Sequence, residues 1–368
     1  MHKDDQMTPN ERLAAFMTGK PMDRILAMPV VCSMSGLALG MTHKEKRSSA
    51  LNEAKAQIAC YERFGNDLTV IEYGLHGVGM ALGTQMNDPE DSVPAIMKYT
   101  LDDLNDVHEL DMSKLELKKD KAFQLHIEAC DILIDKVGKE VPTGVLISGP
   151  FTAAASIYKT EDLLRATRKN PEKLHQLVKF CTEGLKMICR EFIKTGSLIL
   201  LCDPIASGTI LNPKKYLEFV LPYTIDLMKD IHDAKGTVCY HICGDTTAIV
   251  GDMVKSGCDM ISVDNRVDLE YTKQVVGDKV PILGNVDPVG TLILGSTNDV
   301  DLAVKSCIQK TYDSPCGYIL ASGCDLSGRV PMENIDQFMV SARKYGKWPL
   351  NPNNYKSIKK MKNGRIQY

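Results

Sequence analysis

The sequence has no strong excess of charge of one sign, no membrane-length apolar run and no leader-like N-terminus. Its 368 residues contain 44 Lys and Arg against 47 Asp and Glu, a net charge of −3, so a nucleic-acid-binding surface is not indicated. No apolar run is long enough to span a bilayer, and the polar N-terminus, 1–5, has no signal-peptide core. These absences predict a cytoplasmic protein that has neither nucleic acid nor membrane as a partner.

Two further patterns are missing: a disulfide framework and a dinucleotide-binding turn. The 12 cysteines are scattered, and many lie in apolar runs, as Cys60, Cys181 and Cys239 do. In a chain of this length we expect reduced, mostly buried thiols and a reducing cytoplasm, as in an anaerobe. No Gly-x-Gly-x-x-Gly turn follows a predicted strand, so a dinucleotide-binding crevice has no support.

What is present is a regular alternation of short apolar runs with helical patterns. The runs are nearly continuous in apolar residues, which is typical of parallel strands buried on both faces. The eight predicted strands lie at 25–31, 67–72, 143–150, 197–204, within 236–245, at 260–264, 280–285 and 318–323. The alternation predicts the α/β class and a single (β/α)8 TIM barrel, with an open doubly wound sheet as the alternative.

Three segments lie outside this repeat. The start of the chain is predicted to be a helical extension, because Thr8, Pro9 and Glu11 form a capping signature. Residues 74–121, with Gly-rich and acidic pieces, are predicted to be an insertion after the second strand. We therefore expect a barrel domain over residues 1–348 and a basic C-terminal tail over 349–368.

Polar residues cluster where the predicted strands stop. In a barrel these ends share one face, the face that carries active sites. The residues are Glu72, Asp203, His241, Cys243, Asp264, Asn285, Asp287 and Cys324. A single Asp in such a place is more often a helix cap or turn former, but the coincidence across many strands predicts a site. Within it, Glu72, Asp203, Asn285 and Asp287 are expected to line the pocket.

Three of these residues could hold a metal ion. His241 and Cys243 are two apart, so they point to the same side of a strand, and Cys324 follows the last strand. One imidazole and two thiolates with one open position match a catalytic zinc site. Asp264 is expected to be a displaceable fourth ligand. The alternative is a core histidine beside buried thiols, with Asp264 hydrogen-bonded to its own turn.

The donor set also predicts a type of reaction. Two thiolates make zinc a weak Lewis acid, which suits holding a substrate thiol as a nucleophilic thiolate better than polarising water. Alkyl transfer to sulfur is therefore the expected reaction class.

Short motifs spread along nearly the whole chain point to a family. They are Thr8–Leu13 with Pro21–Arg24, Gly149–Thr152, Asp203-Pro204, Pro222-Tyr223, His241–Gly244, Gly284–Pro288, and Gly323–Asp325 with Pro331–Asn334. Together they resemble the uroporphyrinogen decarboxylase superfamily. That resemblance implies a TIM barrel, in agreement with the strand count.

The His241-x-Cys243 pair and the late Gly323-Cys324 resemble the zinc-dependent corrinoid methyltransferase branch, which includes the methylcobamide:coenzyme M methyltransferases. The resemblance implies zinc on His241, Cys243 and Cys324. It also implies a corrinoid (cobalamin) carried by a separate partner protein, because no cobalamin-binding domain is visible in this chain. The expected function is methyl transfer between that corrinoid and a small zinc-activated thiol.

Three alternatives stay open. The enzyme could run the other way, as a demethylase that takes a methyl group from a methylated donor and loads the corrinoid. It could be a non-catalytic corrinoid or tetrapyrrole binder. A uroporphyrinogen decarboxylase-like tetrapyrrole enzyme is disfavoured, because the segment Val31–Gly36 lacks the arginines that bind propionates in those enzymes.

Overall fold

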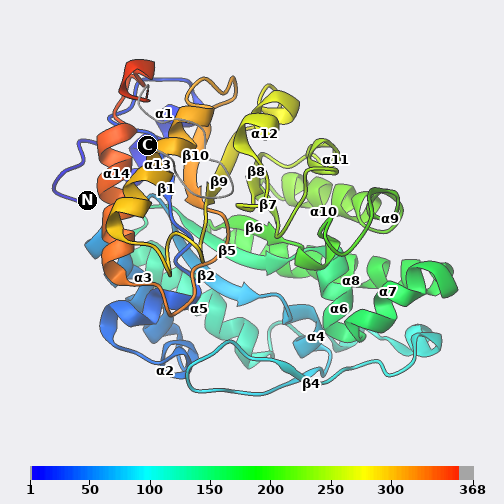
Figure 1. Ribbon diagram of the computed structural model, residues 1–368. Coiled ribbons are helices and arrows are strands. Elements are labelled where there is room, and N and C mark those ends of the chain that lie inside the picture. Colours follow the sequence, from blue (N-terminus) through cyan, green and yellow to red (C-terminus); the bar gives the residue numbers. More distant parts are fainter. Residues whose placement is uncertain (1, 356–368) are drawn as a thin grey trace.

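The computed structural model describes residues 2–355, and a parallel barrel forms its centre (Figure 1). Eight strands pair in the order β1-β10-β9-β8-β7-β6-β5-β2, and all these pairings are parallel. The strands are β1 (Ala27–Met28), β2 (Thr69–Gly74), β5 (Thr143–Ser148), β6 (Leu198–Cys202), β7 (Val238–Ile242), β8 (Met260–Val263), β9 (Ile282–Val286) and β10 (Tyr318–Ser322). They fall on the eight predicted runs, so the predicted (β/α)8 barrel is confirmed.

Helices surround this barrel (Figure 1). The α-helices are α1 (Pro9–Met17), α2 (His43–Arg47), α3 (Ala50–Phe64), α4 (Gly77–Ala81), α5 (Lys121–Val137), α6 (Pro150–Ile157), α7 (Thr160–Lys169), α8 (Pro171–Lys194), α9 (Pro213–Phe219), α10 (Leu221–Asp233), α11 (Val250–Val254), α12 (Leu269–Val276), α13 (Thr297–Thr311) and α14 (Met332–Tyr345). The 3-10 helices are η1 (Ser33–Leu39), η2 (Leu104–Glu109), η3 (Met112–Lys114), η4 (Pro204–Ala206) and η5 (Pro352–Tyr355). The last long helix, α14, packs against α13 and α3, which brings the two ends of the barrel repeat together.

The start of the chain agrees with its sequence pattern. Thr8 begins α1 with a capping box, in which its side chain accepts from the Glu11 amide and the Glu11 carboxylate accepts from the Thr8 amide. Within the predicted tail, Tyr355 is buried and its hydroxyl donates to the Tyr345 carbonyl. The rest of that tail, residues 356–368, lies outside the described residues.

The predicted insertion is a strap that follows β2. It contains α4, a small antiparallel pair of β3 (Gln85–Met86) with β4 (Ile96–Lys98), and the two short helices η2 and η3. Figure 1 shows it as a long cyan segment that runs past α2 and α4. Arg47 of α2 anchors it, because this guanidinium donates to the Asp88 carboxylate and to the Ser92 carbonyl.

The interior of the barrel is filled by alternate residues of the strands, because successive side chains of a strand face opposite sides. Cys239 of β7 and Met260 of β8 belong to an inner apolar cluster, whereas Val238 and Tyr240 pack in the outer core between sheet and helices. His241 therefore lies one layer above Cys239 and faces the barrel axis. The strand spacing thus sends a polar side chain to the barrel mouth.

The thiols agree with the expectation of a reduced protein. All twelve cysteines lie among the described residues and all are free, eight of them buried. Among residues 2–355, none of the helices is both long and apolar enough to cross a bilayer.

A buried ion network lies where β1 meets the start of β2. The Asp67 amide donates to the Ala27 carbonyl at 3.0 Å, and the Asp67 carboxylate accepts from the Ala27 amide at 2.7 Å. The same carboxylate, fully buried, accepts from the guanidiniums of Arg12 and Arg24. Asp5, Asp23 and Arg343 complete the network, so three cations face three carboxylates. This network joins the first and last strands of the sheet order.

Removal of one charge from this network should destabilise the fold. Asp67→Asn leaves the buried arginines with one carboxylate too few, so we expect a loss of about 3–5 kcal/mol in the free energy of unfolding, measured by urea denaturation. The control is Asp336→Asn, which breaks an exposed pair with Arg63 and should cost less than about 1 kcal/mol. Equal effects of the two variants would contradict the role given to Asp67.

Candidate metal centre

Three ligand-type side chains meet at the barrel mouth. His241 lies near the end of β7, Cys243 follows that strand, and Cys324 follows β10. The His241 Nε2 atom lies 3.2 Å from the Cys243 Sγ atom, which lies 3.5 Å from the Cys324 Sγ atom. One ligand atom from each residue falls within 4.8 Å of the others. The structure therefore brings together the three residues that the sequence singled out as metal ligands.

Local contacts fix the orientation of these side chains. The other ring nitrogen of His241, Nδ1, lies 3.0 Å from the Ser262 hydroxyl on β8, which leaves Nε2 directed at the sulfurs. The Ser322 hydroxyl donates to the Cys324 carbonyl at 2.8 Å. Gly323 permits this approach, because a Cβ there would lie 2.6 Å from the Asn265 backbone nitrogen. The two strand ends can thus pack closely enough for their sulfurs to meet.

The three side chains of this trio, His241, Cys243 and Cys324, differ in how their surroundings shift their pKa values. A hydrogen bond from the Cys243 thiol lowers the pKa of Cys324 to about 4, with His241 contributing and burial opposing. The same bond, together with burial, raises the pKa of the Cys243 thiol. Burial opposes a charge on His241, but hydrogen bonding and charge from Cys324 raise its pKa overall. Cys324 thus has the character of a thiolate beside an imidazole.

Asp264, the expected fourth ligand, is hydrogen-bonded to nearby backbone in the structure, and its role as a ligand stays a prediction. One carboxylate oxygen accepts from the Gly244 amide at 2.8 Å and the other from the Arg266 amide at 3.0 Å. Asp264 is not a member of the group of ligand atoms. Its carboxylate instead holds the turn after Cys243, where Gly244 has a φ of 80°. The local hydrogen bond that was the alternative for this residue is the one observed.

The other residues expected to line the pocket fall into two groups: one lines the cavity, and three are hydrogen-bonded to nearby backbone. Glu72 lines the cavity at the mouth, whereas Asp203, Asn285 and Asp287 do not. Asp203 is buried and accepts from the Thr152 amide and hydroxyl at the start of α6; burial raises its pKa to about 6 although these hydrogen bonds oppose the rise.

Asn285 and Asp287 are likewise hydrogen-bonded to backbone groups. The Asn285 amide donates to the Asp264 and Val267 carbonyls. The Asp287 carboxylate accepts from the amides of its own turn. All three residues therefore support the loops of the mouth and do not line it.

A polar chain beside the trio was missed by sequence reasoning. Asp325, next to Cys324, accepts from the Ser33 hydroxyl, and that hydroxyl lies 3.3 Å from Glu72. Lys46 lies 3.7 Å from Glu72 and donates to the Cys32 carbonyl at 2.9 Å. Burial alone would lower the pKa of Lys46, but Glu72 and nearby acids raise it overall. Lys46 and Ser33 lie on helices after β1, so no spacing in the sequence links them to Cys324.

The trio faces a cavity of about 730 Å³ at the mouth of the barrel. Its floor is made by inward-facing apolar residues of the strands. These are Met28, Leu68, Val70, Leu146, Leu200, Cys239 and Leu283. Residues of the strap, including Met86 and Val93, form part of the rim. The cavity therefore combines an apolar body with one sulfur-rich wall.

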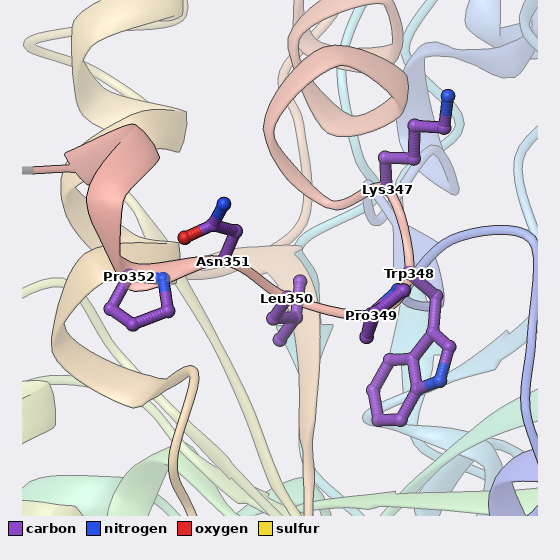
Figure 2. Close-up of a pocket in the computed structure, with 6 residues that line it drawn as sticks. All are labelled: Lys347, Trp348, Pro349, Leu350, Asn351 and Pro352. Atoms are coloured by element: carbon purple, nitrogen blue, oxygen red, sulfur yellow. The ribbon is translucent and has the colours of Figure 1, made fainter.

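A second hollow, of about 490 Å³, is lined by Lys347–Pro352 (Figure 2). Figure 2 shows the side chains of Lys347 and Trp348 pointing away from each other. Lys347 forms a β-bridge with Arg24, and the Trp348 amide donates to the Asp23 carbonyl at 3.1 Å. This places the hollow before β1, at the opposite end of the barrel from the trio. Among the described residues, no acid, histidine or cysteine lines it.

The fold and the site together define a class: TIM-barrel proteins with one imidazole and two sulfurs at the barrel mouth. Comparison with known proteins gives the family. The family profile described as uroporphyrinogen decarboxylase (URO-D) matches residues 8–345. The chain belongs to this family. A uroporphyrinogen decarboxylase of Wigglesworthia glossinidia brevipalpis is 25% identical over 308 residues, 80% of this chain and 82% of that protein.

Other relatives are methyltransferases. Methylcobamide:CoM methyltransferase MtbA of Methanosarcina acetivorans is 30% identical over 357 residues, and MtaA of Methanosarcina barkeri is 25% identical over 350 residues. Each alignment covers 92% of this chain and 99% of the relative. A solved methyltransferase from Methanosarcina mazei has the same fold, with a TM-score of 0.82 and 23% identity, over 92% of this chain and 99% of that one. The predicted family and the prediction of a methyltransferase are confirmed.

The observed role of Asp264 leads to a prediction about metal binding. In Asp264→Asn the three ligand side chains remain but the turn that orients Cys243 loses an acceptor, so zinc should still bind at full stoichiometry. The affinity should fall about 10- to 100-fold, as for other residues that orient ligands, measured by competition with a chelator. A stoichiometry near zero would instead make the carboxylate a true ligand.

Proposed function

We propose that this protein is a zinc-dependent methyltransferase that moves a methyl group between a corrinoid carried by another protein and a small thiol. The observation that carries the proposal is the position of His241, Cys243 and Cys324 on the wall of the cavity. The names of the relatives supply the corrinoid and the thiol: MtaA and MtbA act on methylcobamide and coenzyme M. We extend these substrate classes, but not coenzyme M itself, to this chain.

The three side chains fit a zinc ion. Zinc–sulfur and zinc–nitrogen bonds of about 2.3 and 2.0 Å in a tetrahedron give edges of roughly 3.8 Å between sulfurs and 3.5 Å between nitrogen and sulfur. The observed separations of 3.5 and 3.2 Å need only a small expansion to reach these values. The hydroxyl of Ser262 on Nδ1 of His241 is the kind of outer partner that metal-binding histidines use. When bound, zinc would supply a Lewis acid that favours the thiolate form of a substrate thiol.

The chain's own residues would arrange the reactants. The apolar floor of the cavity excludes water from the space beside Cys243 and Cys324, which protects a nucleophilic thiolate from protonation. The chain of Asp325, Ser33 and Glu72 forms a polar border on the same side. A small thiol would therefore place its sulfur at the trio and its body against the apolar wall.

The corrinoid would approach from the open mouth. Exposed apolar side chains lie on the strap and on the loop after β9, both at the C-terminal ends of strands. They are Met80, Val93, Met97, Val289 and Leu294. Apolar side chains exposed together on one face favour a protein contact. We propose that the corrinoid protein docks here, with residues 74–121 as part of its rim.

The metal proposal makes a direct prediction. Wild-type protein should contain about one zinc per chain, and Cys243→Ala or Cys324→Ala should lose it together with methyl transfer, since each removes one of three ligands. The matched control is Cys202→Ala. Cys202 lines the same cavity and pairs with His241 in register, but it is not in the ligand group. Elemental analysis should find zinc in this control; loss of zinc in all three variants, or in none, would contradict the assignment.

The direction of transfer is tested with free corrinoid. Methylation of a panel of thiols by methylcobalamin supports the proposed function. Methylation of reduced cobalamin by a methylated thiol, without the forward reaction, would favour the demethylase. A methylated-thiol–coenzyme M methyltransferase among the relatives, 25% identical over 342 residues, is the reason to include that arm. The proposal would be overturned if zinc-loaded protein catalysed neither reaction.

The docking proposal is tested on the strap. Val93→Asp puts a charge on an exposed apolar rim position, so KM for a methylated corrinoid protein should rise about 5- to 30-fold, the effect of 1–2 kcal/mol of lost contact. Transfer from free methylcobalamin should stay the same. Val340→Asp, an equally exposed position on α14, is the control. If Val93→Asp left both reactions unchanged, the partner would dock elsewhere.

A further inference from the structure

The cavity has a further polar region, where helices α3 and α5 begin. Glu53 of α3 lines the cavity and is only 2% exposed. Within residues 2–355, its Oε2 atom has no hydrogen-bond partner. Its Oε1 atom lies 3.8 Å from Nε2 of His126 on α5, which is beyond hydrogen-bond distance. The other nitrogen of His126 is bonded to the Ala122 carbonyl at 2.6 Å. Among the described residues, this buried carboxylate thus keeps one acceptor atom, Oε2, without a hydrogen-bond partner.

A second acceptor lines the same cavity. Nδ1 of His76, which follows β2, is buried and has no hydrogen-bond partner in the part of the chain that the structure describes. Burial lowers the pKa of His76, so its ring is neutral and one of its nitrogens is an acceptor. A buried polar atom without a partner is destabilising. Two such atoms around one cavity indicate a place for a ligand that donates hydrogen bonds.

The cations that line the cavity are already paired. Lys46 is held by Glu72 and by the Cys32 carbonyl. Lys44 lies 3.1 Å from Asp88, and Arg47 donates to the same carboxylate. Within the described residues, no Lys or Arg on the cavity wall is left to face an anion. An anionic group would also meet Glu53 and Glu72 in a low-dielectric space, where unpaired charge is costly.

We infer that this region binds the tail of the substrate and selects a positively charged or hydrogen-bond-donating group, an ammonium above all, in preference to a sulfonate or carboxylate. The inference rests on the proposed function for the sulfur end of the substrate. The Glu53 carboxylate would accept from the ammonium, with His76 as a second acceptor. Tyr73 lines the same part of the cavity and stacks edge-on against His126, which supplies an aromatic wall beside the cation.

Three thiols of equal length test this inference: 2-aminoethanethiol, 2-mercaptoethanol and 2-mercaptoethanesulfonate. They carry a cationic, a neutral and an anionic tail, respectively. Calorimetric binding to zinc-loaded wild-type protein should rank them in that order, with at least about tenfold, or 1.4 kcal/mol, between the first and the last. Methylation by methylcobalamin, measured in parallel, shows whether each bound thiol is a substrate.

Glu53→Gln removes the charge and keeps the shape. Its Kd for 2-aminoethanethiol should rise about tenfold, the loss of a hydrogen bond between charged groups, while that for 2-mercaptoethanol changes less than about twofold. The ratio of the two Kd values cancels the different acidities of the thiol groups. Glu62→Gln, an exposed position on the same helix, is the matched control and should leave the ratio unchanged.

The outcomes separate the two proposals. If the sulfonate binds tightest and is methylated, the tail inference is overturned and the proposed function stands. If zinc-loaded protein methylates none of the thiols, the proposed function fails. An equal ratio in Glu53→Gln and Glu62→Gln would remove Glu53 from the site. The ranking of the three thiols uses wild-type protein only, so it can still refute the inference if the Glu53→Gln protein fails to fold.

Discussion

The candidate metal centre depends on one close approach, that of two cysteine sulfurs from strand ends 81 residues apart. Cys243 and Cys324 lie 3.5 Å from each other, and His241 completes the group at 3.2 Å. β7 and β10 are not neighbours in the sheet; β8 and β9 separate them. Their ends can meet only because the sheet closes into a barrel whose parallel strands all point to one mouth. The buried network at Asp67 fixes the first strand of this barrel against the next, at the far end from the sulfurs.

The surroundings of the sulfurs explain why the group suits a metal ion. Two sulfurs, an imidazole and the nearby carboxylate of Asp325 concentrate electron-rich atoms in a partly buried place, which is costly without a compensating cation. Asp264 and Ser262 are used to orient the group. One orders the turn after Cys243, and the other directs the histidine ring. The protein thus devotes its polar groups at the mouth to fixing three ligands and leaves the adjacent cavity mainly apolar.

The sequence could predict those features that repeat or that depend on spacing. Short apolar runs alternating with helices predicted all eight strands. The two-residue spacing of His241 and Cys243 predicted that they share a face. The sequence could not tell a cavity-lining residue from one that supports a loop, because Asn285 and Asp287 also have backbone groups within reach. Lys46, Ser33 and Glu53 were missed because they lie on helices and turns after β1, and only tertiary packing brings them to the cavity.

X-ray absorption at the zinc edge tests the central claim most directly, since it reports the ligands of the metal in the intact protein. The account predicts two sulfur neighbours at about 2.3 Å and at least one nitrogen at about 2.0 Å, with a third sulfur appearing when a substrate thiol is added. A shell of oxygen and nitrogen alone, or a sulfur count that does not rise with the thiol, would contradict it.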